Sequence, residues 1–307
     1  MPSYHRSVLE KEVVELMVRD PSGKYLDATL GGGGHAVAVL AALGPEGTFI
    51  GLDRDPQALA HCRESVGGDP RAKLHLAPFS QLGKYCPPQS LQGALFDLGV
   101  SSHQLDDRSR GFSFEAGTPL DMRMGPDAGA SALEWLRGAT EEEMAGAFAQ
   151  LSDLPKARAL ARRIKELMHN VEETGSDALR MAVDSVYKPG HSERAGLLAR
   201  VFQAVRMRVN REPEEIRSGL SAAVAALSRG GRLCVLSYHS AEDREVKETL
   251  GSFERDCICP PRLPVCTCGR GHRTLRKVIP KPLEAGPGEL RSNPRARSAK
   301  LRVVERV

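Results

Sequence analysis

The sequence predicts an α/β protein with a doubly wound parallel sheet and a helical insertion. Short apolar strands alternate with helical segments up to Asp97, which is typical of a parallel sheet. From about Ser131 to Arg211 the chain is rich in Ala, Leu, Glu and Arg at helical spacing, without a clear strand. A helix, a Gly-Gly turn and a further strand then return, so the insertion interrupts one sheet.

Each element before the insertion has its own signal. Apolar, β-branched or aromatic runs bounded by turn residues predict four strands, and helical periodicity predicts the helices between them. Pro56 suits the first turn of one helix. The strands are expected in KYLDATL (24–30), TFIGL (48–52), AKLHLAPFS (72–80) and LQGALFD (91–97), and the helices in HAVAVLAAL (35–43) and PQALAHCRESV (56–66).

The second half of the sheet comes from the end of the chain. A strand is expected over Arg232–Ser237 and a last one in AKLRVVERV (299–307). The proline-rich stretches CPPRLPVC and IPKPLEAGPGE are expected to be loops. The predicted domains are residues 1–108 with 207–307 as the discontinuous sheet domain, and 109–206 as an inserted helical substrate-recognition domain.

Composition indicates a globular protein of the cytoplasm. Apolar residues make up 41% and charged residues 27% of 307 residues, enough for a packed core. No apolar run approaches the roughly 18 residues of a membrane span. Charges at Glu10, Lys11, Glu12 and Glu15 interrupt any signal-peptide core. The seven cysteines are therefore expected to be reduced thiols.

The net charge of +4 is unevenly distributed. Residues 254–307 hold 13 Lys/Arg and 5 Asp/Glu, a net of +8, and the preceding residues hold 30 and 34, a net of −4. A basic end on a near-neutral body fits a phosphate-rich partner. A solvated basic tail would look the same.

Four consecutive glycines, 31–34, stand between the first strand and its helix. Glycine permits positive φ and lets a ligand approach the backbone, so the turn is a candidate cofactor loop. Gly31, Gly33 and Ala36 match G-x-G-x-x-G/A, and Asp53 follows Gly31 by 22 residues, as in a dinucleotide site. S-adenosylmethionine (SAM) needs the same ribose-binding acid. Asp27 suits the cationic amino-acid end of SAM better than a pyrophosphate, which favours SAM.

Side chains suited to one ligand recur at the strand ends. Asp27, Asp53, Phe79 and Asp97 all fall at or just after a predicted strand. Ligands of open α/β sheets bind beyond the carboxyl ends of the strands, so we expect these side chains to meet there. Phe79 offers a flat face for adenine, although burial in the core is its alternative role.

Several motifs together resemble the bacterial 16S ribosomal RNA cytosine-N4 methyltransferase family, the MraW type. They are DATLGGGGH, GLDRDPQAL, APFSQL, FDLGVSSHQLD, RGFSF, PLDMRM, FQAVRMRVN, GGRLCVLSYHSAEDR and NPRARSAKLR. The resemblance runs from His5 almost to the C-terminus and is weakest over 138–194. It implies a Rossmann-like SAM-dependent methyltransferase sheet.

The implied activity is methyl transfer from SAM to the exocyclic amine of a cytidine in the decoding region of 16S rRNA, within the small subunit. The implied cofactor contacts are Gly33, Gly34, His35, Asp53, Phe79, Asp97 and Gln104. The alternatives are methylation of another amine, in a protein glutamine or a DNA base, and a nonenzymatic RNA-binding module. An NAD-linked dehydrogenase is the least favoured.

Asp97 is also the candidate catalytic residue, because a carboxylate there could accept an N–H of the acceptor amine and orient it. Arg295, Arg297 and Lys300 are the candidate phosphate contacts. His239 and Arg244 follow a strand and are candidate RNA contacts, with a structural role as the alternative.

Four cysteines form a separate pattern, C-x-C-x6-C-x-C, at Cys257, Cys259, Cys266 and Cys268, with His272 nearby. Four thiolates can bind zinc, but zinc sites ordinarily use C-x2-C or longer spacing. The sequence therefore favours a flexible substrate loop, and no metal is assigned.

Overall fold

The computed structural model describes residues 7–170, 175–260, 263 and 265–307. The chain divides into two compact units, residues 1–99 with 214–307 (the sheet unit) and 100–213 (the helical unit). The sequence put the borders at 108/109 and 206/207. The second of these falls inside helix α9 (His191–Val209), which continues past it.

The sheet unit contains one seven-stranded sheet in the order β3-β2-β1-β4-β5-β7-β6. The first five strands in this order are parallel, and β7 is antiparallel to both β5 and β6. The strands are β1 (Lys24–Asp27), β2 (Thr48–Asp53), β3 (Ala72–Leu76), β4 (Leu91–Asp97), β5 (Leu227–Ser237), β6 (Leu275–Lys277) and β7 (Lys300–Arg306).

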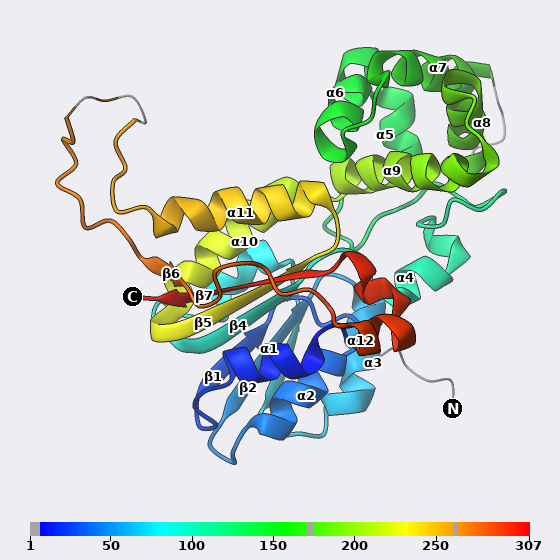
Figure 1. Cartoon of the computed structure of the whole chain (residues 1–307). Helices are drawn as coiled ribbons and strands as arrows, with labels where there is room; N and C mark the ends of the chain where they lie inside the picture. Colours follow the sequence, from blue (N-terminus) through cyan, green and yellow to red (C-terminus); the bar gives the residue numbers. More distant parts are fainter. Residues whose placement is uncertain (1–6, 171–174, 261–262, 264) are drawn as a thin grey trace. The chain divides into compact units, whose positions relative to one another are not determined.

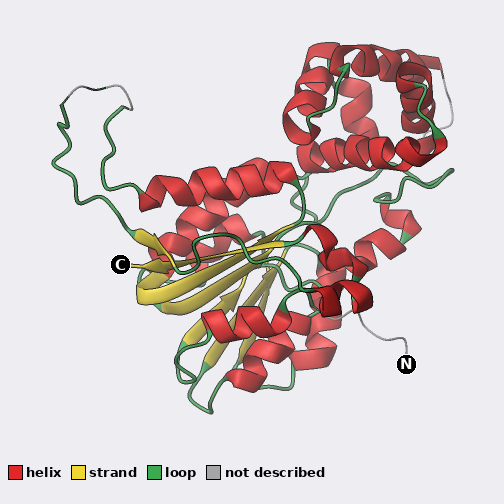
Figure 2. Ribbon diagram, in the orientation of Figure 1, coloured by secondary structure: helices red, strands yellow, loops and turns green. Residues whose placement is uncertain are grey.

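Helices cover both faces of this sheet (Figures 1 and 2). Successive strand residues point to opposite faces, so Leu26 and Phe96 pack with α10 and α11, whereas Tyr25 and Leu95 pack with α1, α2 and α3. The sheet is thus packed between two apolar layers. The helices of this unit are α1 (Glu10–Met17), α2 (Gly34–Ala42), α3 (Pro56–Val66), α10 (Glu212–Ala226, which starts just before the unit border), α11 (Ser240–Glu254) and α12 (Pro287–Ser292), with short 3-10 helices η1 (Phe79–Lys84) and η3 (Pro294–Ser298).

The helical unit is built around its own core, as expected from its composition. The amphipathic α7 buries Leu160 and Ile164 against the neighbouring helices. Capping boxes at Ser131 and Thr140 start two of these helices. The elements are α4 (Ser102–Asp106), η2 (Arg108–Arg110), α5 (Ala132–Gly138), α6 (Glu141–Ser152), α7 (Ala157–Asn170), α8 (Ser176–Tyr187) and α9.

Several expectations are corrected by the structure. The third strand ends at Leu76, and Phe79 begins η1 instead of lying on a strand. The Gly-Gly turn before Arg232 is part of β5, because the chain continues through a register shift against β4. The sheet is mixed and not fully parallel, since β7 runs antiparallel to its neighbours β5 and β6.

The prediction that the two proline-rich stretches are loops is confirmed only in part. The end of IPKPLEAGPGE forms the first turn of α12, because Pro287 suits the start of a helix. Pro261, Arg262 and Pro264 of CPPRLPVC lie outside the described residues. Across the described part of the chain, no helix combines the length and apolar character needed to cross a bilayer.

Candidate active site

The three acids predicted at strand ends lie on neighbouring parallel strands. Asp27 ends β1, Asp53 ends β2 and Asp97 ends β4. β1 lies between β2 and β4, and the chain order of the sheet reverses there. Because these strands are parallel neighbours, all three carboxyl groups lie at one edge of the sheet. The reversal of strand order at this edge is the switch point at which open α/β sheets bind ligands.

Asp53 fastens the glycine loop to the sheet. Its Oδ2 accepts a hydrogen bond from the Gly31 N–H at 2.8 Å, and its Oδ1 accepts one from the Asp55 N–H at 2.8 Å. Burial nevertheless raises the pKa of Asp53 to about 6, although these two amides oppose the shift. A ligand hydroxyl at this carboxylate would add a donor to an acceptor that is already oriented.

The loop itself requires glycine at Gly33. This residue caps α2 with φ of +80°, a left-handed conformation that favours glycine. A Cβ there would also lie 3.1 Å from Cys62 Sγ. The positive φ therefore explains why glycine occupies position 33 of the glycine run.

Asp27 is a buried acid with an unused oxygen. Its Oδ1 accepts from the Thr29 N–H at 3.0 Å, whereas Oδ2 is buried and has no hydrogen-bond partner among the described residues. Burial raises the pKa of Asp27 to about 7, and the nearby carboxylates of Asp97 and Asp53 add to the shift. An orphaned acidic oxygen of this kind fits a positively charged ligand group.

His35 starts α2 beside Asp97. Its Nε2 lies 3.6 Å from Asp97 Oδ2, which is beyond hydrogen-bond distance. Burial lowers the pKa of His35 to about 4, so the ring is neutral at pH 7 and forms no ion pair. Neither ring nitrogen has a hydrogen-bond partner within the described structure. The neutral ring keeps one donor and one acceptor for a ligand.

Asp97 is held from two sides. Its backbone N–H donates to Thr29 Oγ1 at 2.6 Å, and its Oδ1 accepts a hydrogen bond from the Tyr238 hydroxyl at 2.6 Å. Burial raises the pKa of Asp97 to about 7, against the opposing effect of Tyr238, and Glu242 adds to the rise. Burial and the Asp97 carboxylate raise the pKa of Tyr238 above its usual range, so the phenol remains a donor.

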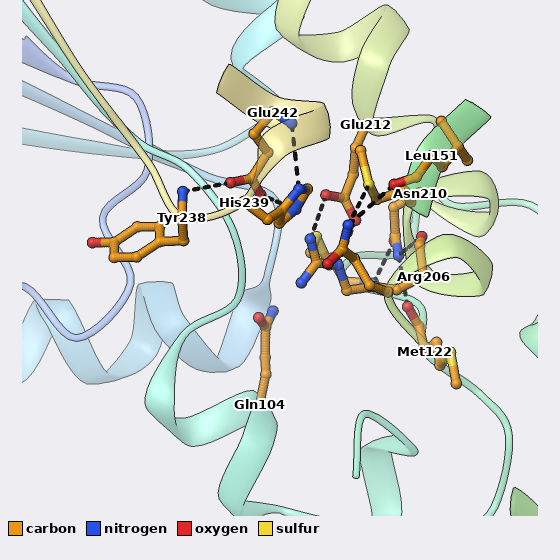
Figure 3. A network of polar contacts seen from close by, with 12 residues as sticks. Gln104, Met122, Leu151, Arg206, Asn210, Glu212, Tyr238, His239 and Glu242 are labelled. Atoms are coloured by element: carbon orange, nitrogen blue, oxygen red, sulfur yellow. Dashed lines mark hydrogen bonds and ion pairs between the residues drawn. The ribbon is translucent and has the colours of Figure 1, made fainter. Parts of the chain in front are cut away.

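A buried carboxylate behind Tyr238 organises the start of α11 (Figure 3). Glu242 is fully buried and accepts from the Tyr238 N–H at 2.8 Å. His239 caps the helix, because its Nδ1 accepts from the Glu242 N–H at 3.3 Å, and its Nε2 lies 2.8 Å from Glu242 Oε1. The sequence missed Tyr238 and Glu242, although both lie in the YHSAE stretch after β5.

His239 therefore has a structural role in α11, the alternative that the sequence left open. Arg244 is exposed on the same helix. Contact of either residue with RNA stays a prediction.

Phe79 is half-buried. Its ring packs edge-to-face on Phe96 with centroids 5.4 Å apart, and a Cβ on Gly219 of α10 would lie 2.5 Å from the Phe79 ring. One side of the ring thus belongs to the core. Stacking of adenine on Phe79 stays a prediction.

Gln104 lies in the helical unit and is buried there. Its side-chain Oε1 accepts from the Ser101 N–H at 3.0 Å, and its backbone N–H donates to Ser101 Oγ at 3.2 Å. Gln104 thus completes the capping box of α4. Contact of Gln104 with SAM stays a prediction.

The helical unit also contains a polar clamp that sequence reasoning missed (Figure 3). Buried Asn210 donates to the Met122 carbonyl at 2.7 Å and accepts from the Met124 N–H at 2.8 Å. Met122 has φ of +58°, a left-handed conformation that is costly for a non-glycine residue. Arg206 and Glu212 form a bidentate ion pair nearby, at 2.8 Å for both bonds. The motifs PLDMRM and RMRVN are thus parts of one clamp.

The three predicted phosphate contacts are not equivalent. Arg297 is exposed on η3 and Arg295 is half-buried there. Lys300 Nζ lies 3.9 Å from Asp243 Oδ2, while Arg302 makes the tighter bidentate pair with the same carboxylate. Lys300 therefore links β7 to α11, and Arg297 is the most exposed of the three. Contact of these residues with RNA stays a prediction.

The sheet and its site define a class of protein. The strand order places antiparallel β7 between β5 and β6, unlike the 3-2-1-4-5-6 order of dinucleotide-binding folds. The acidic switch point also fits a cationic ligand better than a pyrophosphate. Both features fit a Rossmann-like methyltransferase.

Comparison with known proteins identifies the family. The MraW methylase family matches residues 2–307, and the chain belongs to this family. It is similar to the ribosomal RNA small subunit methyltransferase H of Trichlorobacter lovleyi (41% identity over 99% of this chain and 98% of the relative). It is also similar to the protein of the same name in Thioalkalivibrio sulfidiphilus (43% identity, 99% and 97%).

Among solved structures, an rRNA methylase of Streptococcus thermophilus matches with a TM-score of 0.43 and 12% identity, over 97% of this chain and 93% of that one. The assignment rests on the family instead. The chain is thus a methyltransferase, and its methyl donor is SAM.

Proposed function

We propose that this chain transfers the methyl group of SAM to the N4 amine of a cytidine in the decoding region of 16S rRNA, within the small ribosomal subunit. The observation that carries the proposal is the acidic switch point, with Asp97 held by Tyr238, in a member of the MraW methylase family. The relatives' name, ribosomal RNA small subunit methyltransferase H, supports the substrate.

The geometry of the sheet edge supports the proposed SAM contacts. The amides of Gly33 and Gly34 and the ring of His35 line the start of α2, and the carboxylate of Asp53 would accept from the ribose hydroxyls. Asp27 Oδ2 has the charge and the missing partner that a cationic group requires. When bound, SAM supplies a methyl group that is already activated on a sulfonium sulfur.

The task of the protein is to orient the acceptor. The cytosine N4 lone pair is delocalised into the ring, so the amine must be held in line and allowed to pyramidalise. Asp97 would accept one N–H of this amine at Oδ2, because Oδ1 is already occupied by the Tyr238 hydroxyl. The bond from Tyr238 fixes the carboxyl rotamer before the substrate arrives.

No general base is required in this scheme. The amine becomes acidic only after the methyl group has been transferred, and its proton can then pass to Asp97 or to water. With a pKa of about 7, Asp97 is suited to accepting a proton and releasing it near neutral pH.

RNA binding is assigned to the basic C-terminal segment, with Arg295, Arg297 and Lys300 on phosphates and His239 and Arg244 as further contacts. The +8 charge of residues 254–307 supports this assignment. The helical unit is proposed to take part in substrate recognition, and Gln104 to contact the cofactor.

The test is methylation of small subunits that lack the modification, with labelled SAM and analysis of the nucleosides. We expect the label in N4-methylated cytidine of 16S rRNA. Label in another nucleoside would disprove the N4 assignment, and label in protein would favour the protein-amine alternative. SAM binding without transfer to subunits, naked RNA or protein would favour the nonenzymatic module.

A further inference from the structure

The loop between α11 and β6 brings four cysteine sulfurs together. The Sγ atoms of Cys257, Cys259, Cys266 and Cys268 all lie within 4.8 Å of one another. Four of the pairs are separated by 3.6, 4.0, 3.5 and 3.6 Å. A tetrahedral zinc ion with Zn–S bonds of about 2.3 Å would hold its sulfurs about 3.8 Å apart. We propose that these four cysteines form a structural zinc site.

The separations do not fit disulfides. A disulfide requires sulfurs about 2.05 Å apart, whereas the four cysteines are free thiols and each of these separations is well beyond that length. The C-x-C spacing that weighed against zinc in the sequence is accommodated by the backbone. Gly269, directly after Cys268, and Gly271 take φ of +77° and +80°, so the chain turns sharply just after the last cysteine.

Backbone amides already point at the sulfurs. The Thr267 N–H donates to Cys259 Sγ at 3.3 Å. Amides of Arg270 and Ile258 also donate to Cys268. Such donors stabilise negatively charged sulfur, which is the form that binds a metal.

The surrounding arm needs a cross-link of this kind. Between α11 and β6 the chain extends away from the sheet (Figure 1), and its described residues form no helix or strand. Ile258 and Val265 are 62% and 72% exposed, so the arm has little apolar core of its own. Ordering such a segment loses conformational entropy that burial does not offset. A metal bound by both ends of the C-x-C-x6-C-x-C segment would close the arm.

The donor set selects the metal. Four thiolates in tetrahedral arrangement favour zinc over magnesium or calcium, which prefer oxygen ligands. No position is left open for water, which is typical of a structural site. His272 is outside the sulfur set, because its Nε2 lies 2.9 Å from the Cys268 carbonyl oxygen. In that position His272 orients the backbone beside Cys268, one of the proposed metal ligands.

The first measurement is the metal content of the full chain, purified with reductant and without chelator. We expect roughly one zinc per chain. Cobalt substitution should give thiolate-to-metal charge-transfer bands and the strong visible bands of tetrahedral coordination. Cys266→Ser should lose most of the zinc, whereas Cys86→Ala, which alters a buried cysteine far along the chain, should retain it.

A second measurement does not depend on the variants. Chelation of the wild-type chain should increase the rate of tryptic cleavage at Arg255, Arg270 and Arg273 of the arm, and added zinc should restore protection. A folded wild-type chain that binds no zinc, before or after anaerobic reconstitution, would overturn the proposal. Two disulfides among these cysteines in protein isolated without air would overturn it as well.

Discussion

The acidic edge of the sheet and the cysteine arm each hold several titratable side chains close together, but different interactions hold them. At the sheet edge, Asp27, Asp53 and Asp97 are fixed by strand register and kept close together although they repel one another. Among the described residues of the arm, local turns and a few amide donors hold the four thiols.

The difference shows where the energy of each cluster comes from. Two apolar layers on the sheet stabilise the acids in place without a ligand, and the cost appears as pKa values raised to about 6 or 7. The arm has no such layers, so its cluster depends on the proposed metal. A preorganised site can bind and release SAM repeatedly, whereas a structural metal is expected to remain bound.

The largest expected effect is at Asp97. Asp97→Asn should lower the methylation rate at saturating SAM by about 100-fold, because a misoriented acceptor loses its in-line geometry. SAM affinity, measured by calorimetry, should change less. Tyr238→Phe keeps the ring and removes only the hydroxyl, so a smaller loss of rate is expected. A normal rate in Asp97→Asn would remove this residue from the catalytic mechanism.

Next in size is the effect at Asp53. Asp53→Ala should weaken SAM binding by about 1.5–3 kcal/mol, through loss of a charged hydrogen bond to the ribose. Because Asp53 also holds the Gly31 amide, Asp53→Asn is the sharper variant, since it retains an acceptor. Calorimetry with exposed Asp20→Asn as the control measures the effect. Unchanged SAM affinity in both Asp53 variants would contradict the ribose assignment.

Asp27 should link SAM affinity to pH. Its pKa is about 7 in the free protein, and a cationic group beside it favours the carboxylate. Affinity should therefore fall by up to about tenfold per pH unit below 7. Asp27→Asn should bind SAM more weakly at pH 8 and should flatten this dependence. A wild-type affinity that is constant between pH 5 and 8 would argue against a cation at Asp27.

Asp27→Asn also tests how far the buried carboxylate destabilises the folded protein. The folded pKa of Asp27 is raised above its unfolded value of 3.8, so its contribution to stability is present below about pH 4 and is lost as the pH rises to about 7. Asp27→Asn should therefore melt at a higher temperature than the wild type at pH 8, with a smaller difference at pH 4. An equal or lower melting temperature at pH 8 would show that the carboxylate is stabilised by contacts in the free protein.

The smallest expected effect is at Arg297. If it contacts one phosphate, Arg297→Ala should reduce the slope of log affinity against log salt by about 1 for binding to the small subunit. The melting temperature and SAM affinity should not change. Lys73→Ala, an exposed lysine on β3, is the matched control. The triple neutralisation of Arg295, Arg297 and Lys300 should reduce the slope further, but Lys300 also pairs with Asp243, so some loss of stability is expected there.

The sequence by itself determined the sheet, the inserted helical segment and the family. Strand and helix periodicity, glycine at positive φ and acids after apolar strands are local signals, and the structure bears them out at β1, β2, β4 and the glycine loop. The exact C-x-C spacing was equally visible, but spacing alone could not show how far apart the sulfurs lie.

Only the tertiary structure decided which side chains meet. Tyr238 reaches Asp97 across 141 residues of sequence, and Asn210 reaches Met122 across 88. The antiparallel direction of β7 and the packing of Phe79 against Gly219 also depend on distant segments. No local pattern encodes these contacts, because each arises where parallel strands and packed helices bring remote residues to one place. The pKa values that make the acidic edge chemically useful follow from the same burial.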